Sequence, residues 1–146
     1  AGVYAADLER LAQQYNNVTY KGLVSASDAA QLNADYVWAL LPIEDEVTRY
    51  AFPSKSSSYV FSGALIAAVC GNETSVAKWV TDNRLGVVVA PEVDALCQFF
   101  LNVERGQYDA EAFDFERKEL NHSLGFDVFL HNLTGLVIGM DGRRSD

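Results

Sequence analysis

The segment from Phe52 to Tyr59 combines the residue types that bind phosphate groups. It reads Phe-Pro-Ser-Lys-Ser-Ser-Ser-Tyr and stands at the expected start of a helix, just before an apolar run. The first N–H groups of a helix lack intrahelical partners and the helix dipole is positive there, so an anion is stabilised at this end. Lys55 and the serine hydroxyls add donors, which makes the segment a candidate phosphate site. In the alternative, which composition alone favours, Ser54 caps the helix and the other serines are simply solvated.

Two further groups of polar residues point to less specific chemistry. Glu44, Asp45 and Glu46 offer carboxylate oxygens, but consecutive loop residues rarely converge on one ion, so we expect a solvated loop and no metal. His122 and His131 have no second ligand at helical spacing, so we expect surface or helix-packing roles for both.

The charge balance restricts the partners. The 146 residues include 11 Lys and Arg against 20 Asp and Glu, a formal charge of -9. Nucleic-acid binding needs a positive face, so the charge argues against this class, whereas one lysine with backbone N–H groups can still hold a small anion. The apolar runs are far shorter than the roughly 20 residues of a membrane span, and the N-terminal residues lack a signal-peptide pattern.

Apolar periodicity predicts helices that alternate with strands. The expected helices are Ala5–Tyr15, Ser27–Ala34, Ser56–Gly63, Glu73–Asp82 and Val93–Glu104, with Ser27 and Asn72 as N-caps. The expected strands are Asn17–Tyr20, Tyr36–Leu41, Leu65–Val69 and Gly86–Ala90, with Ile43–Arg49 as a loop. The last three strands are continuous apolar runs, which are typical of strands covered on both faces. The alternation predicts a doubly wound α/β domain, a Rossmann-like parallel sheet with helices on both faces.

Four residues are expected inside the core. Trp38 lies in an apolar strand and Trp79 in an amphipathic helix. Cys70 and Cys97 are expected to be buried free thiols, because unpaired cysteine behaves as a small hydrophobe.

The two ends of the chain depart from the alternating pattern. No strand precedes the first helix, so the opening βα unit of such a domain is missing and we expect a fragment of a longer protein. From residue 108 to residue 140 we expect a helical region that packs on the domain formed by residues 1–107, and Asp141–Asp146 reads as a tail. The apolar stripe of this region includes Phe126, Phe129, Leu133 and Val137.

Several segments, in order, resemble a known family. They are Leu8–Ala12, Asn17–Gly22, Ala34–Tyr36, Tyr50–Lys55 with Ser58, Tyr59 and Gly63, Leu65–Ala68, and Gly86–Val89 with Pro91. The stretch from Pro53 onward is similar to the P-S-K-x-x-S-Y signature of bacterial GT-B glycosyltransferases of the glycosyltransferase 4 group. The likeness covers roughly residues 5–138 and corresponds to the C-terminal, donor-binding half of the GT-B fold.

The resemblance implies a retaining transfer of a sugar from a nucleotide diphosphate donor, without a metal or other cofactor. By position, Lys55 with Ser54 and Tyr59 would face the donor phosphates, and Ser58 would stand near the ribose or sugar. Many relatives carry two glutamates eight residues apart, where this chain has Tyr50 and Ser58, so the preferred base and sugar stay open.

The turn formed by Gly22, Leu23 and Val24 resembles the loop that approaches the nucleotide base. The expected partners are therefore the nucleotide-sugar and an absent N-terminal acceptor-binding domain. The stripe of the C-terminal region would contact that domain or form a homodimer, and any membrane contact would run through the absent parts. Alone, the chain is expected to bind donor weakly and not to turn over.

The resemblance further implies a bacterial, cytoplasmic enzyme of polysaccharide biosynthesis, which could act peripherally at the inner face of the membrane on a cell-surface polysaccharide or glycolipid. Two alternatives stay open. One is a sugar-nucleotide epimerase of GT-B shape, and the other is a non-enzymatic, flavodoxin-like binding domain with no affinity for nucleoside diphosphates.

Overall fold

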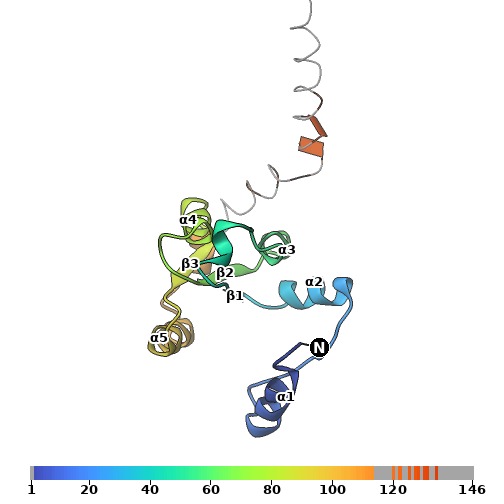
Figure 1. The fold of residues 1–146 in the computed structure, drawn as a ribbon, viewed down its shortest axis with the longest axis vertical. Coiled ribbons are helices and arrows are strands. Elements are labelled where there is room, and N and C mark those ends of the chain that lie inside the picture. The colour runs from blue at the N-terminus through green and yellow to red at the C-terminus, as the bar shows by residue number, and fades with distance from the viewer. Residues whose placement is uncertain are drawn as a thin grey trace, which may run out of the picture.

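A computed structural model of the chain describes residues 2–113 and, beyond them, residues 120, 122, 125, 127, 128, 130, 131 and 134. Within these residues, three parallel strands form one sheet in the order β1-β2-β3. The strands are β1 (Trp38–Pro42), β2 (Leu65–Val69) and β3 (Gly86–Val89), as Figure 1 shows. The predicted Rossmann-like α/β architecture is confirmed.

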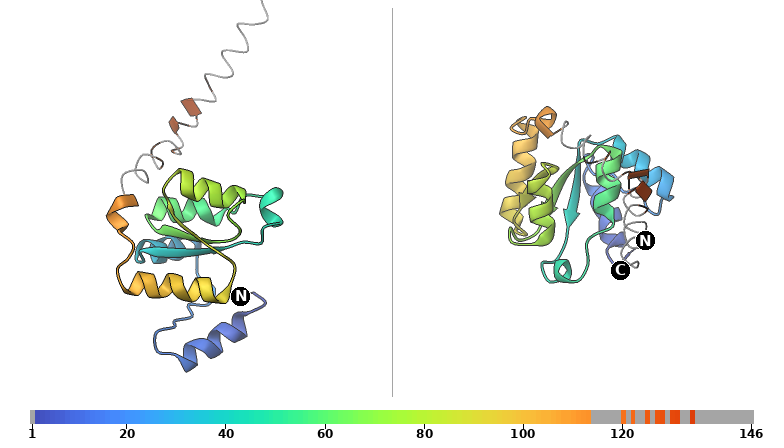
Figure 2. Two further views of the ribbon diagram at one scale, coloured as in Figure 1. Left: turned by 90° about the vertical axis from the view of Figure 1, so that its left-hand side faces the viewer. Right: turned by 90° about the horizontal axis from the view of Figure 1, so that it is seen from above.

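The helices divide between the two faces of the sheet. They are α1 (Ala5–Gln14), α2 (Ala26–Ala34), α3 (Lys55–Ser62), α4 (Ser75–Asp82) and α5 (Val93–Glu104), with short 3-10 helices at Val47–Arg49 and Ala110–Phe113. Figure 2 shows α3 and α4 on one side of the sheet and α5 on the other. Because α3 and α4 each join two parallel strands, their N-termini lie at the carboxyl ends of the strands. Proteins of the α/β class usually bind their ligands at this end of the sheet.

Each face of the sheet has its own apolar cluster. On one side, Val60 of α3 and Val80 of α4 pack with Ile66 of the central strand, and all three are buried. On the other side, Phe99 of α5 packs against the sheet, and its ring stands edge-on to Trp38 at 5.2 Å between ring centroids. Trp38 and Trp79 pack against these two clusters, so their predicted core role is confirmed.

Gly86 allows β3 to pair closely with β2. Its φ of +152° lies where side chains are rarely accommodated, and a Cβ there would collide with the backbone of Ile66. A glycine at the start of β3 is therefore required for the parallel pairing.

The predicted strand Asn17–Tyr20 is wrong. The segment forms no ladder, and the N–H of Val18 instead donates to the carbonyl of Tyr15 in a turn. Its β-branched and aromatic residues favour an extended chain, but a strand also needs a neighbour with which to exchange hydrogen bonds. The described part of the chain accordingly holds three strands, where the sequence predicted four.

Both predicted N-caps are also wrong. The N–H of Asp28 donates to Ser25 Oγ at 3.1 Å, so Ser25 and not Ser27 is the N-cap. The helix α2 accordingly begins at Ala26. At α4, the N–H of Ala77 donates to Thr74 Oγ1 at 3.1 Å, and the expected cap Asn72 lies in the preceding turn. In each case several polar residues could cap, and the length of the preceding turn selects one.

Two expectations about burial fail. Cys70 is buried as predicted, but Cys97 is exposed on the outer side of α5. Strand β1 is only partly covered on the face opposite α3 and α4, because it is an edge strand and α5 and Tyr108 pack there mainly against Trp38. Leu40 is consequently 38% exposed and Pro42 is also exposed.

The predicted C-terminal region lies largely outside the described residues, and so do its stripe (Phe126, Phe129, Leu133 and Val137) and the tail Asp141–Asp146. Among the residues that are described, Leu120 packs against the cluster below α3 and α4. His122 and His131 are exposed, in line with the surface role expected of them.

Candidate functional site

The first turn of α3 holds the predicted phosphate-binding residues. Ser54 has helical backbone angles, and its side chain caps no N–H group, so the interpretation of Ser54 as a capping residue is wrong. Ser56 Oγ donates to the carbonyl of Pro53 at 2.6 Å, and this serine is fully buried. Ser54, Lys55 and Ser58 are exposed. The positive end of the helix dipole therefore meets solvent beside an exposed lysine.

Tyr59 connects this helix to the outer edge of the sheet. Leu65 donates its N–H to the carbonyl of Val37, so the backbone N–H and C=O groups of Val37 point toward β2. These groups point to alternate sides along a strand, so the carbonyl of Leu40, three residues later, points away from β2 and out from the edge of the sheet. The Tyr59 hydroxyl donates to that outward Leu40 carbonyl at 3.4 Å. Burial raises the pKa of the Tyr59 phenol above its ordinary value, so the hydroxyl stays protonated and can donate at neutral pH.

Lys55 lies on the same side of α3 as Tyr59. The two residues are four positions apart, and side chains at this spacing lie one above the other on a helix. Because α3 runs from the carboxyl ends of the strands toward their amino ends, Lys55 lies about one turn nearer the carboxyl ends than Tyr59 does. The helix thus presents a lysine and a tyrosine along the outer edge of β1.

A polar cavity of about 430 Å³, here called the edge cavity, lies along this edge of β1. Its lining comprises Asn17, Thr19, Lys21, Leu32, Asn33, Tyr36, Trp38, Ala39, Leu40 and Tyr59. It offers one ammonium group, several amide and hydroxyl groups, and the faces or edges of three aromatic rings. Such a mixture suits a polar ligand that carries both a negative charge and a flat ring.

The edge cavity brings together two regions that the sequence analysis singled out separately. Tyr59 belongs to the predicted phosphate segment, and Lys21 directly precedes Gly22, the start of the predicted base loop. Ser54, Lys55 and Ser58 do not line the cavity, and neither do Gly22, Leu23 and Val24. Leu23 is 85% exposed.

Sequence reasoning missed the polar side of the edge cavity. Asn17, Thr19 and Lys21 alternate with Val18 and Tyr20 in and directly after the stretch that was predicted to be a strand. That period-two polar alternation was the available signal.

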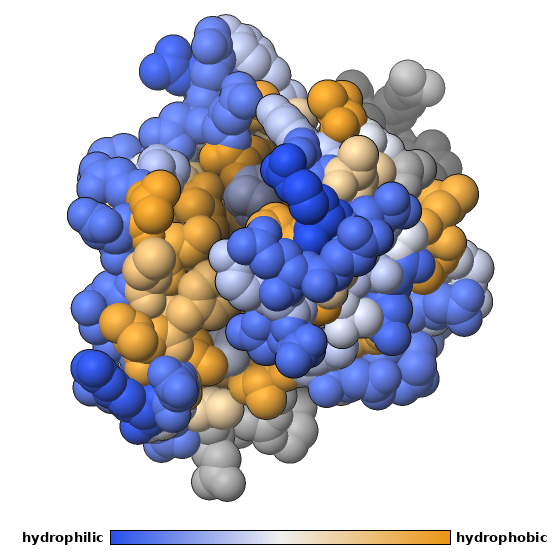
Figure 3. Space-filling model, turned by 90° about the horizontal axis from the view of Figure 1, so that it is seen from below, coloured by the Kyte–Doolittle hydropathy of each residue, from blue (hydrophilic) through white to orange (hydrophobic). Residues whose placement is uncertain are grey.

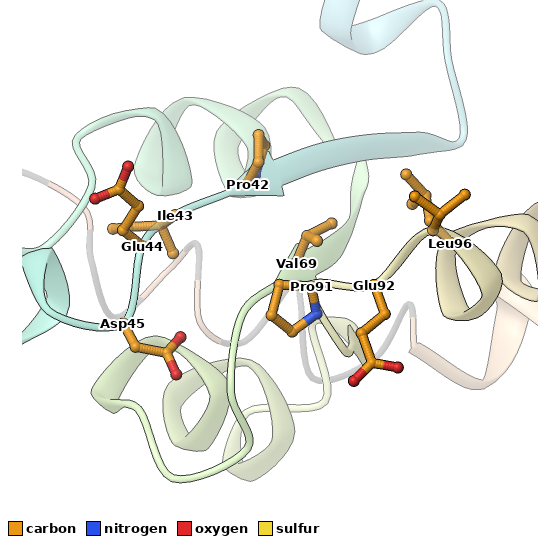
Figure 4. A pocket seen from close by; sticks show the side chains of 9 residues that line it. Pro42, Ile43, Glu44, Asp45, Val69, Pro91, Glu92 and Leu96 are labelled. Atoms are coloured by element: carbon orange, nitrogen blue, oxygen red, sulfur yellow. The ribbon is translucent and has the colours of Figure 1, made fainter.

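A second cavity, of about 660 Å³, lies at the carboxyl ends of the strands and is here called the strand-end cavity (Figure 4). Its lining comprises Pro42, Ile43, Glu44, Asp45, Val69, Pro91, Glu92, Val93 and Leu96. The lining is apolar apart from three carboxylates, and it includes no basic residue. Sequence analysis predicted neither this cavity nor its acidic rim.

Asp45 is more than the solvated loop residue that we expected. Its Oδ1 accepts the N–H of Gly71 at 2.8 Å, across 26 positions of the chain. A Cβ on Gly71 would collide with the same carboxylate. Asp45 therefore ties the loop after β1 to the loop after β2, whereas Glu44 and Glu46 are exposed as expected.

The described residues include no group of three or more His, Cys, Asp or Glu side chains that could hold a metal ion. In that same part of the chain, no helix is long and apolar enough to cross a membrane. Comparison with protein-family models, with curated proteins and with solved structures finds no match to this chain. The family resemblance seen in the sequence therefore stays a prediction.

Proposed function

We propose that this chain binds the nucleotide diphosphate part of a sugar donor and serves as the donor-binding part of a glycosyltransferase. The diphosphate lies at the start of α3 beside Lys55, and the nucleoside lies in the edge cavity. The observation that carries the proposal is the contact of Tyr59 with Leu40, which holds the Lys55-bearing side of α3 against the strand edge where that cavity lies.

The chemistry of the two parts agrees with such a ligand. The uncapped first turn of α3 leaves N–H groups for phosphate oxygens, and Lys55 adds a positive charge beside them. In the edge cavity, Tyr36 and Trp38 can contact a base, while Asn17 and Asn33 supply amide donors and acceptors. Base–aromatic stacking contributes about 1–3 kcal/mol per base in other proteins.

Lys55 and the dipole of α3 would also assist the transfer itself. When the bond between the sugar and the diphosphate breaks, negative charge grows on the departing phosphate oxygens. A fixed cation and aligned N–H groups stabilise that charge without reorganising. In such an enzyme a second domain would bind the acceptor, so this chain alone is expected to bind donor and to transfer no sugar.

A thermal-shift survey with UDP, GDP and ADP tests the proposal and identifies the base. A ligand at a hundred times its Kd raises the free energy of unfolding by about 2.7 kcal/mol, which is readily seen as a higher melting temperature. We expect one of the three to stabilise the chain most. If none of them does so up to millimolar concentration, the flavodoxin-like alternative is favoured. Sugar release by the purified chain would contradict its expected inactivity.

The epimerase alternative receives less support. It requires histidine and carboxylate groups that converge on the ligand. Neither His122 nor His131 lines the edge cavity or the strand-end cavity.

A further inference from the structure

The strand-end cavity is unlike the edge cavity in chemistry and in position. It lies on the side of the sheet that α5 covers, whereas Tyr59 and Lys55 belong to α3 on the opposite side. We propose that the strand-end cavity is a separate ligand site, which takes a small molecule with an apolar body and a positively charged amino group. This inference does not depend on the proposed nucleotide site.

The apolar residues at the floor of the cavity suit the apolar body of the proposed ligand. Val69 at the end of β2 and Leu96 of α5 are only partly buried, and Pro42 at the end of β1 is exposed. They stay accessible because a single helix covers this face of a three-stranded sheet. The volume of about 660 Å³ falls within the range of about 300–1,000 Å³ that small-molecule sites occupy. Covering this surface contributes about 25 cal/mol for each Å² of apolar area removed from water.

The side of the molecule where α1 and α5 lie also exposes apolar surface. Figure 3 shows, on the side where α1 and α5 lie, a hollowed apolar band bordered by hydrophilic residues.

The acidic residues at the rim of the cavity suit the amino group of the proposed ligand. Glu44, Asp45 and Glu92 are the charged residues of the lining, and no lysine, arginine or histidine lies among the lining residues. Asp45 is engaged by Gly71, but Glu44 and Glu92 form no ion pair with any described residue. Figure 4 shows these two on opposite sides of Val69, with the carboxylate of Glu44 pointing away from Val69, so each acts on a ligand through its charge and not as one of a converging pair. The start of α5 at Val93 carries about half a positive charge, which the full negative charges of Glu44, Asp45 and Glu92 outweigh, so the mouth attracts a cation more than an anion.

The two cavities thus sort ligands by charge. Lys21 at the edge cavity favours an anion, and the carboxylates at the strand-end cavity favour a cation. A nucleotide and an amine are therefore expected to bind the same chain without competing.

The test is a nuclear magnetic resonance titration of the chain with three probes that share one apolar body: 2-phenylethylamine, 2-phenylethanol and 3-phenylpropionate. We expect the amine to shift the resonances of Val69, Val93 and Leu96, the alcohol to do so more weakly, and the acid least. Equal binding of amine and acid, shifts confined to other residues, or no shifts up to about 10 mM would each overturn the proposal.

Charge variants make the test independent of any folding defect, because the altered side chains are exposed. In the double variant Glu44→Gln/Glu92→Gln, the Kd of the amine is expected to rise about three- to tenfold, as exposed ion pairs contribute up to about 1 kcal/mol each. Glu104→Gln, at the far end of α5, is the matched control and should leave the Kd unchanged. Val93→Lys, on the exposed rim, should abolish the preference for amine over acid; a preserved preference in this variant would refute the assigned role of charge.

Discussion

The hydroxyl of Tyr59 donates a hydrogen bond of 3.4 Å to the main-chain carbonyl of Leu40, on the outer edge of β1. The bond lies at the long end of the accepted range, so its contribution is mainly to orientation. It links α3, which packs on the sheet through the buried side chain of Val60, to the outer edge of β1. Lys55, four residues before Tyr59, lies on the same side of the helix.

Replacing Tyr59 by Phe should have a small effect on stability with a characteristic pH dependence. Loss of a long hydrogen bond is expected to lower the free energy of unfolding by less than about 1 kcal/mol near neutral pH. Burial raises the pKa of Tyr59 in the folded chain, so the unfolded chain loses this proton first as the pH rises. The stabilising contribution of the neutral phenol is therefore present below about pH 10 and is lost above it.

Urea unfolding of the wild-type chain and of Tyr59→Phe, at pH 8 and pH 11, checks this sign. The free energy of unfolding of the wild type, relative to that of Tyr59→Phe, should be lower at pH 11 than at pH 8. Comparison with Tyr59→Phe removes the contribution of the other tyrosines. A difference independent of pH would contradict the burial of the phenol.

The contact of Asp45 with Gly71 should appear as coupling between the two loops. Asp45→Ala removes the acceptor of the Gly71 N–H and is expected to cost about 1–2 kcal/mol, whereas Glu46→Ala, its exposed neighbour, should cost little. Gly71→Ala should be more destabilising in the wild-type chain than in Asp45→Ala, since the added Cβ collides with that carboxylate. Additive costs in a double-mutant cycle would disprove the contact.

The cap of α4 can be assigned by a pair of variants. Thr74 Oγ1 accepts the Ala77 N–H and also donates to the carbonyl of Gly71, so Thr74→Ala is expected to cost about 1–2 kcal/mol. Asn72→Ala, at the residue that sequence reasoning chose, should cost less than about 0.5 kcal/mol. Denaturant midpoints measure both, and a larger effect at Asn72 would reverse the assignment.

The two thiols should differ in reactivity. A thiol reagent added to the folded chain is expected to modify Cys97, which is exposed, and to leave Cys70, which is buried, until the chain is unfolded. The variant Cys97→Ser should therefore show no fast-reacting thiol. Rapid modification of Cys70 in that variant would contradict its place in the core.

The sequence predicts the central sheet well because its strands are marked by composition and by their boundaries. Leu65–Val69 and the helix Val93–Glu104 were predicted with the bounds that the structure has, since Gly63 ends the helix before the first and Pro91 precedes the second. Gly63 has a φ of +86°, the left-handed conformation that ends α3.

Features that depend on tertiary neighbours were not predictable in the same way. Asn17–Tyr20 has strand-forming residues, but whether a segment pairs depends on what lies beside it. The exposure of Cys97 depends on which side of α5 meets the sheet, and Leu96 and Phe99 occupy that side. The same contrast holds for the candidate site. The start of α3 can be predicted from the sequence as a motif, whereas both cavities are formed by residues distant in sequence.

The most direct test of the proposed function is a calorimetric titration of the preferred nucleoside diphosphate into the wild-type chain and three lysine variants. Lys55→Ala and Lys21→Ala each remove a cation from the proposed site and are expected to weaken binding about tenfold, which corresponds to about 1.4 kcal/mol. Lys78→Ala, which removes an exposed lysine of α4 that pairs with Glu73, should leave the Kd unchanged. Equal affinity in all four proteins would contradict the account, because the nucleotide would then bind elsewhere on the chain.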